Sequence, residues 1–185
     1  MVQCGMVRPN AMSPALRLAL ACSAVALMGA GDAEPAGNVF NDPFEPVTAG
    51  VAACPTPEGP RYTAAQARAE SHGRAERGTS CFLSGRCRLS NAYLYDQEIA
   101  PRVQRFLTQD GRYARSSLWI VVQRRWVFLM GCVASEDMGR AAERDILSVD
   151  DVERVVGLWA VDPSTVPYPV AAASRPASGA SARGE

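Results

Sequence analysis

Cysteine and histidine, the residue types that most often hold metals or act as nucleophiles, are few in this chain. It has six cysteines and a single histidine, His72. A zinc site needs ligands at close spacing, and CFLSGRC, which joins Cys81 to Cys87, is not a C-x-x-C pair. His72 lies in the polar segment RAESHGRAERG, where it is predicted to be a solvated residue near a helix end. We therefore predict no metal site and no cofactor.

Carboxylates are the other groups that could do chemistry, as a general acid and base. The candidates are Asp96, Glu98 and Asp110, with the adjacent pairs Glu136, Asp137 and Asp150, Asp151. Carboxylates in the first turn of a helix or just before a strand usually cap the helix or lie in solvated turns. An enzyme that uses these groups is the alternative, but we predict a protein without catalytic residues.

Residues 1–33 are predicted to be a cleavable signal peptide. Arg17 precedes the apolar run LALACSAVALM, and small residues follow it. The run is too short to span a bilayer. Met1 and Met12 are both compatible with the start of this leader. We expect export to the periplasm.

Four cysteines remain after the leader, and an even number in an oxidising compartment predicts two disulfides. All three ways of pairing them stay open on the sequence alone. These disulfide candidates are Cys54, Cys81, Cys87 and Cys132.

Residues 34–90 are predicted to be an N-terminal extension. Its first half is rich in Pro, Gly and Ala and is typical of an extended lead-in. A short polar helix is predicted to start at Thr63 and to end at Gly73 or Gly78. A compact cysteine-bearing connection follows over residues 81–89.

Residues 91–161 have the strongest periodicity and are predicted to be the folded domain. The predicted order of elements is helix, strand, strand, helix, strand, which indicates the α+β class. The helices are expected to begin near Asp96 and after the cap Ser135, and the strands are SLWIVVQ, WVFLMGCV and VERVVGLWAV. Residues 162–185 mix Pro, Ala, Ser and Gly without periodicity, which predicts a disordered tail.

The segment WVFLMGCV, the charged helix after it and DDVERVVGLWAV resemble the BON domain, the bacterial osmotic-shock and nodulation module. The positions that match its pattern are Val127, Leu129, Gly131 and Val133, followed by Val152, Val155, Trp159 and Val161. The chain departs from the family at two places, with Arg124 and Arg125 in place of a turn of the Asn-Gly type and Asp150 and Asp151 where a glycine usually precedes valine.

The BON resemblance implies a fold and a class of function. The fold is two helices packed on one face of a three-stranded mixed sheet. The implied function is that of a non-catalytic module of periplasmic and envelope proteins, for which binding of phospholipid or other envelope polymers is proposed.

Strand alternation divides the apolar residues between the two faces of the sheet. The positions of the first matching motif face the helices, with Gly131 expected to let a helix approach closely. The outward set carries no charge and comprises Trp119, Val121, Trp126, Phe128, Met130, Cys132, Val156, Leu158 and Ala160. An uncharged apolar face of this size is expected to be covered and not exposed to water. Its covering is either the chain's own residues 54–89, tied by a disulfide from Cys132, or a lipid or protein partner, or a second copy.

The predicted function is a non-enzymatic periplasmic module that binds or scaffolds phospholipid or another envelope component, in envelope maintenance or osmotic stress. The alternative is an accessory subunit or adaptor of an envelope or secretion protein complex. The formal net charge of zero argues against a nucleic acid partner. A band of arginines could meet lipid phosphate, namely Arg102, Arg105, Arg112 and Arg115. The predicted binding surface combines Trp119, Trp126, Phe128, Arg102 and Arg105.

Overall fold

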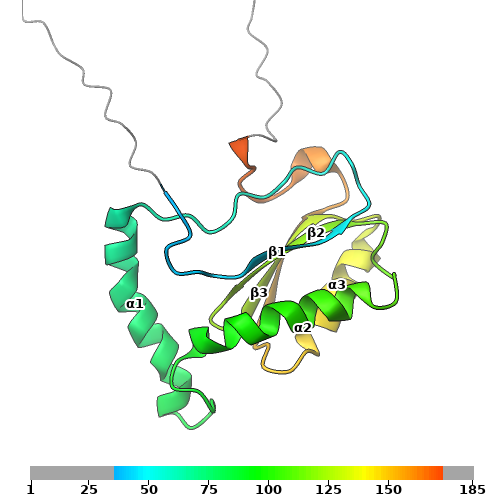
Figure 1. The fold of residues 1–185 in the computed structure, drawn as a ribbon. Coiled ribbons are helices and arrows are strands. Elements are labelled where there is room, and N and C mark those ends of the chain that lie inside the picture. The colour runs from blue at the N-terminus through cyan, green and yellow to red at the C-terminus, as the bar shows by residue number, and fades with distance from the viewer. Residues whose placement is uncertain (1–35, 173–185) are drawn as a thin grey trace, which may run out of the picture. The chain divides into compact units, whose positions relative to one another are not determined.

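The computed structural model describes residues 36–172, so the predicted signal peptide and residues 173–185 lie outside the described residues. The elements are β1 (Phe44–Ala49), α1 (Ala64–Leu83), the 3-10 helix η1 (Ala92–Tyr95), α2 (Asp96–Thr108), β2 (Ser117–Gln123), β3 (Trp126–Cys132), α3 (Glu136–Leu147), β4 (Arg154–Ala160) and the 3-10 helix η2 (Pro163–Thr165) (Figure 1). None of the described helices is long and apolar enough to cross a membrane.

The strands form one mixed sheet in the order β1-β2-β3-β4, in which β3 and β4 are parallel and the other neighbours are antiparallel. The predicted α+β fold, with its helix, strand, strand, helix, strand order, is confirmed from α2 to β4. The fourth strand, β1, comes from the segment predicted to be an extended lead-in. Its Pro46 cannot donate a ladder hydrogen bond and is tolerated because β1 is an edge strand, whose register shifts between Pro46 and Thr48.

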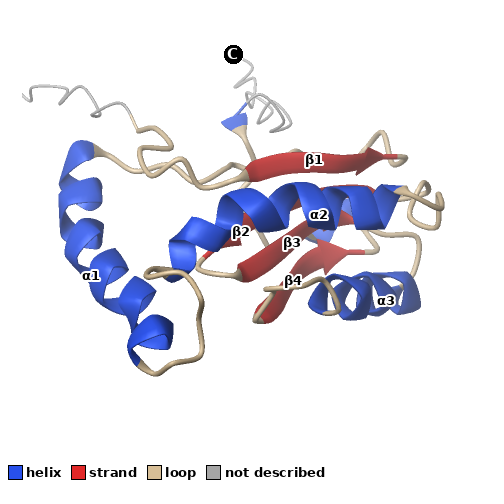
Figure 2. Ribbon diagram, turned by 60° about the horizontal axis from the view of Figure 1, so that its bottom comes forward, coloured by secondary structure: helices blue, strands red, loops and turns tan. Residues whose placement is uncertain are grey.

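Helices α2 and α3 cover one face of the sheet (Figure 2). The core under them is fully buried and consists of Ile99, Val103 and Leu107 from α2, Leu118, Ile120 and Val122 from β2, Val127 and Leu129 from β3, and Ala142 and Ile146 from α3. The predicted alternation of side chains is therefore confirmed for this face. The role expected of Gly131 is wrong: its φ is +133°, and a Cβ there would meet the main-chain oxygen of Ser117 on β2, so the close approach is between strands.

Helix α1 is longer than the sequence predicted, because it continues through Gly73 and Gly78 to Leu83. Thr63 and Gln66 form a capping box at its start, as a hydroxyl cap predicts. Gly78 stays in the helix because its bare Cα lets the Asn91 side chain pack against it. The left-handed residue that follows the helix is Gly85, with φ +71°.

The outward face of the sheet is covered by two segments of the same chain. The N-terminal strap, residues 54–62, is anchored by a disulfide between Cys54 and Cys132, and a second disulfide joins Cys81 to Cys87. The predicted anchor at Cys132 is thus confirmed, although only the first part of the expected covering segment takes part.

The second covering segment is the C-terminal strap, residues 166–171, and the prediction of disorder is wrong for this part of the tail. Tyr168 is buried against Val121 and Met130 on the outward face. Its hydroxyl donates to the Pro55 carbonyl at 2.7 Å, and the Glu58 amide donates to the Pro169 carbonyl at 2.7 Å. The two straps therefore hold each other as well as the sheet.

Candidate functional site

The structure separates the residues that were predicted to form one binding surface. Trp126 and Phe128 lie half-buried on the outward face, whereas Arg102 and Arg105 belong to α2, which packs on the opposite face. Trp119 is also half-buried and outward, beside Pro46 of β1 in the register. The five residues therefore do not lie on one face of the sheet, and the binding role of each stays a prediction.

Two arginines of the predicted band, Arg102 and Arg112, are engaged in structural contacts, whereas Arg105 and Arg115 are exposed. The Arg102 Nη2 atom lies 3.1 Å from Asp151 Oδ2, and its Nη1 atom donates to the Asp150 carbonyl. Arg112 pairs with Asp110 and with Asp145. Asp150 and Asp151, which depart from the family pattern, thus help to fix α2 to the start of β4. The Asp151 carboxylate and the Asp150 main-chain carbonyl therefore have a structural role.

A groove of a different composition runs over the hairpin end of the outward face. We call it the arginine–aromatic groove, and it consists of two adjoining depressions of about 320 and 160 Å³ that share Tyr62, Gln123 and Phe128. The larger is apolar at its base, where Val121, Met130 and Leu158 lie. The smaller is lined by Arg74, Arg77, Tyr93, Arg124 and Trp126, and also by Glu70, which pairs with Arg77.

Trp126 is the centre of the basic part of the groove. The Arg124 guanidinium lies 4.7 Å and that of Arg154 4.6 Å from the centre of a Trp126 ring. Arg154 reaches this place because the parallel register pairs it directly with Trp126. The Trp126 Nε1 atom is buried and has no hydrogen-bond partner among the described residues.

Neither Arg124 nor Arg154 forms an ion pair within residues 36–172. The other arginines of the groove are compensated, since Arg74 pairs with Asp42 and Arg77 with Glu70. The groove therefore has two uncompensated positive charges next to an indole donor, at the end of an apolar floor. This is an arrangement that attracts an anion with an apolar part.

The turn between β2 and β3 depends on a buried carboxylate. Arg124 and Arg125 both have positive φ, 55° and 66°, which arginine rarely adopts. Asp96, at the start of α2, accepts hydrogen bonds from both of their backbone N–H groups at 2.7 Å. This explains how the chain makes a tight hairpin without the Asn-Gly type of turn, and it fixes the position of Arg124 in the groove.

Burial raises the pKa of Asp96 to about 6, against the opposing effect of the two N–H donors. The folded chain thus holds this proton more tightly than the unfolded chain, so the associated stability is present below pH 3.8 and is lost as the pH rises through about 6. Relative to Asp96→Asn, the free energy of unfolding of the wild type should fall by roughly 2–3 kcal/mol between about pH 4 and pH 7. Urea unfolding of both proteins across this range measures the effect, and a constant difference between them would contradict the raised pKa.

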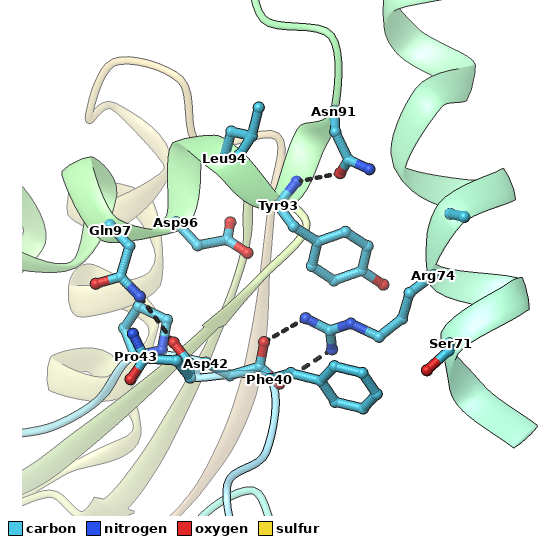
Figure 3. A pocket seen from close by; sticks show the side chains of 12 residues that line it. Phe40, Asp42, Pro43, Ser71, Arg74, Asn91, Tyr93, Leu94, Asp96 and Gln97 are labelled. Carbon is cyan, nitrogen blue, oxygen red and sulfur yellow. Dashed lines mark hydrogen bonds and ion pairs between the residues drawn. The ribbon is translucent and has the colours of Figure 1, made fainter. Parts of the chain in front are cut away.

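A salt bridge at the far side of the groove attaches α1 to the rest of the molecule. The Arg74 guanidinium bonds both carboxylate oxygens of the buried Asp42 and lies between the rings of Phe40 and Tyr93, at 4.2 and 3.9 Å from their centres (Figure 3). Gln123 of β2 donates to the same carboxylate at 2.6 Å. Arg74 and Tyr93 also line a larger cavity of about 530 Å³. Since its buried charges are already paired, we place the candidate site in the arginine–aromatic groove.

The described residues contain no group of three or more His, Cys, Asp or Glu side chains that could hold a metal ion. The groove itself presents mainly arginines and aromatic rings, and its two carboxylates, Glu58 and Glu70, are paired with Arg61 and Arg77.

Comparison with known proteins gives one match. The family model of the BON domain matches residues 95–163, the span from the end of η1 to the start of η2. No curated protein and no solved structure matches the chain. BON domains are generally non-catalytic binding modules associated with lipids and the cell envelope. The match and the fold together make the chain a BON domain-containing protein, with a disulfide-tied extension packed on the outer face of the domain's sheet.

Proposed function

We propose that this protein is a non-enzymatic periplasmic module that binds anionic phospholipid in the arginine–aromatic groove. The observation that supports the proposal is the juxtaposition of Arg124, Arg154 and the unpartnered Trp126 Nε1 atom at one end of an apolar floor. The role in envelope maintenance or osmotic stress that the resemblance implies belongs to the same proposal.

The two parts of a phospholipid suit the two parts of the groove. A phosphodiester accepts charge-assisted hydrogen bonds from guanidinium groups, which Arg124 and Arg154 offer on either side of the Trp126 indole. The partly exposed Phe128 and Leu158 side chains, next to the buried Val121 and Met130, offer an apolar surface to the beginning of an acyl chain. An anionic headgroup is favoured over a zwitterionic one because neither arginine has a carboxylate within ion-pair distance among the described residues.

A periplasmic location is consistent with the disulfides. Cys54–Cys132 and Cys81–Cys87 persist in an oxidising compartment, which the predicted signal peptide would reach. An envelope protein as the partner is the alternative, and it becomes the leading one if no lipid binds.

Titration calorimetry with short-chain phospholipids, kept below the concentration at which they form micelles, tests the proposal. Dihexanoyl phosphatidylglycerol should bind at least about tenfold more tightly than dihexanoyl phosphatidylcholine, and the difference should shrink as salt is added. Inorganic phosphate is the control for the headgroup alone and should bind more weakly than either lipid. Equal affinity for the two lipids, or no binding of either, would exclude the groove as an anionic lipid site.

A further inference from the structure

We propose that the protein has a second lipid contact, in which the end of α1 and the loop that follows it dock onto the surface of an anionic bilayer. We call this segment, residues 82–88, the α1 tip. It lies outside the residues that match the BON domain. The inference rests on the proposed function for its choice of lipid as the partner, but it concerns different residues.

The α1 tip presents two large apolar side chains to water. Phe82 is 45% exposed and Leu83 is 80% exposed, and they are adjacent at the end of the helix. The rest of α1 is polar and buries only Gly78 and Cys81. No other segment of the described structure covers this pair, whereas the N-terminal and C-terminal straps cover the outward face of the sheet.

The exposed pair is held in a fixed position. The Cys81–Cys87 disulfide closes the loop, and the Arg86 amide donates to the Cys81 carbonyl at 2.9 Å. The Gly85 amide donates to the Phe82 carbonyl, also at 2.9 Å. Behind the loop, the Leu89 amide donates to the Tyr95 hydroxyl of the domain. Because the exposed pair is held on a rigid loop, it loses little conformational entropy when it binds.

The charge around the tip is positive. Residues 77–95 contain three arginines and no Asp or Glu. Arg86 is exposed, follows the apolar pair closely, and donates through Nε to the Ser84 hydroxyl without an ion pair among the described residues. Arg88 pairs with both Glu98 and Asp151 but stays about half exposed, so Arg86 is the arginine of the tip whose charge is not paired among the described residues. Apolar side chains flanked by arginines suit the interface of an anionic membrane, where rings and aliphatic groups enter the headgroup region and guanidinium groups meet phosphate.

The small size of the apolar tip favours a bilayer over a protein partner. A stable protein interface needs about 800 Å² from each partner around a central apolar cluster. Two side chains at the end of a projecting polar helix do not supply that area, whereas each can insert separately between lipid headgroups.

Flotation with vesicles of phosphatidylcholine and phosphatidylglycerol in equal parts tests the α1 tip. The double variant F82S/L83S should lose at least about tenfold in vesicle binding and keep the wild-type affinity for monomeric dihexanoyl phosphatidylglycerol. Leu147→Ser is the matched control, because Leu147 is a similarly exposed apolar residue at the end of α3, and it should bind vesicles like the wild type. Unchanged urea midpoints confirm that both variants are folded, as expected for exposed positions.

Three outcomes overturn the inference. Wild-type vesicle binding by F82S/L83S shows that the tip does not touch the membrane, and loss of monomeric lipid binding by the same variant shows that the tip is no separate contact. Failure of the wild type to bind vesicles also overturns the inference. The proposed function fails only if the wild type does not bind monomeric anionic lipid either. Arg86→Gln should weaken binding to the mixed vesicles about threefold and leave binding to pure phosphatidylcholine unchanged.

Discussion

Replacing Cys54 and Cys132 together by alanine should lower the free energy of unfolding by roughly 4–5 kcal/mol. The disulfide joins residues 78 positions apart, so it removes much of the conformational entropy of the unfolded chain. Cys132 is fully buried, and the smaller alanine side chain adds a packing loss to this. The loss is large compared with the total stability of an ordinary domain. Chemical denaturation of the two proteins under non-reducing conditions measures the difference.

The second disulfide is the control for this prediction. The loop between Cys81 and Cys87 spans a separation of six residues, so replacing both by alanine should cost only roughly 2 kcal/mol. The Cys54/Cys132 variant should also bind a hydrophobic dye, because the N-terminal strap is then free to leave the outward face. Equal losses in the two variants, or a Cys54/Cys132 variant as stable as the wild type, would show that the strap does not depend on its anchor.

Replacing Arg124 and Arg154 together by glutamine should lower the affinity for dihexanoyl phosphatidylglycerol about 100-fold. Each hydrogen bond between a guanidinium group and a phosphate contributes roughly 1.5 kcal/mol or more, and the two arginines are the uncompensated charges of the groove. The arginines make no ion pair among the described residues, so their loss should leave the fold intact. Titration calorimetry measures both variant and wild type.

A variant with the same change of charge elsewhere controls for long-range attraction. Arg105→Gln with Arg115→Gln removes two exposed arginines of the predicted band, neither of which forms an ion pair within the described range. This control should bind the lipid within about twofold of the wild type, because exposed charges at a distance are screened by salt. If the control loses as much affinity as the groove variant, the band on the helix side is the binding surface after all.

The elements with a clear periodicity could be predicted from the sequence. The alternating strands at residues 117–123 and 126–132 and the capped helix after Ser135 lie where the pattern placed them. The apolar outward set predicted that another segment covers this face of the sheet. The position of Cys132 predicted where that segment is anchored. These features depend on neighbours along the chain, which a sequence shows directly.

Two parts of the fold escaped prediction because their stability comes from distant contacts. β1 contains Pro46 and a change of register, and it is a strand only because β2 lies beside it. The C-terminal strap has a composition typical of disorder, yet Tyr168 finds an apolar surface on the far side of the sheet and a carbonyl at Pro55. Neither of these distant contacts can be inferred from a pattern of neighbouring residues in the sequence.

The candidate site was predicted in part for the same reason. Trp126 and Phe128 follow from strand alternation, but the arginines chosen to accompany them, Arg102 and Arg105, lie on the other side of the sheet. Arg154 is next to Trp126 only through the parallel register of β3 and β4. The Arg-Arg turn was visible as a departure from the family pattern, and this departure was the available signal for Arg124.

The Trp126 indole N–H resonance in an NMR titration with dihexanoyl phosphatidylglycerol tests the central claim most directly. Trp126→Phe assigns the signal, and Trp159, whose Nε1 already donates to Glu143 Oε1 at 2.7 Å, is the internal control. Binding in the arginine–aromatic groove should shift the Trp126 signal to saturation, because the phosphate then binds the two guanidinium groups that stack on the indole, and should leave the Trp159 signal in place. A Trp126 signal that stays unmoved while the lipid is bound elsewhere would contradict the account.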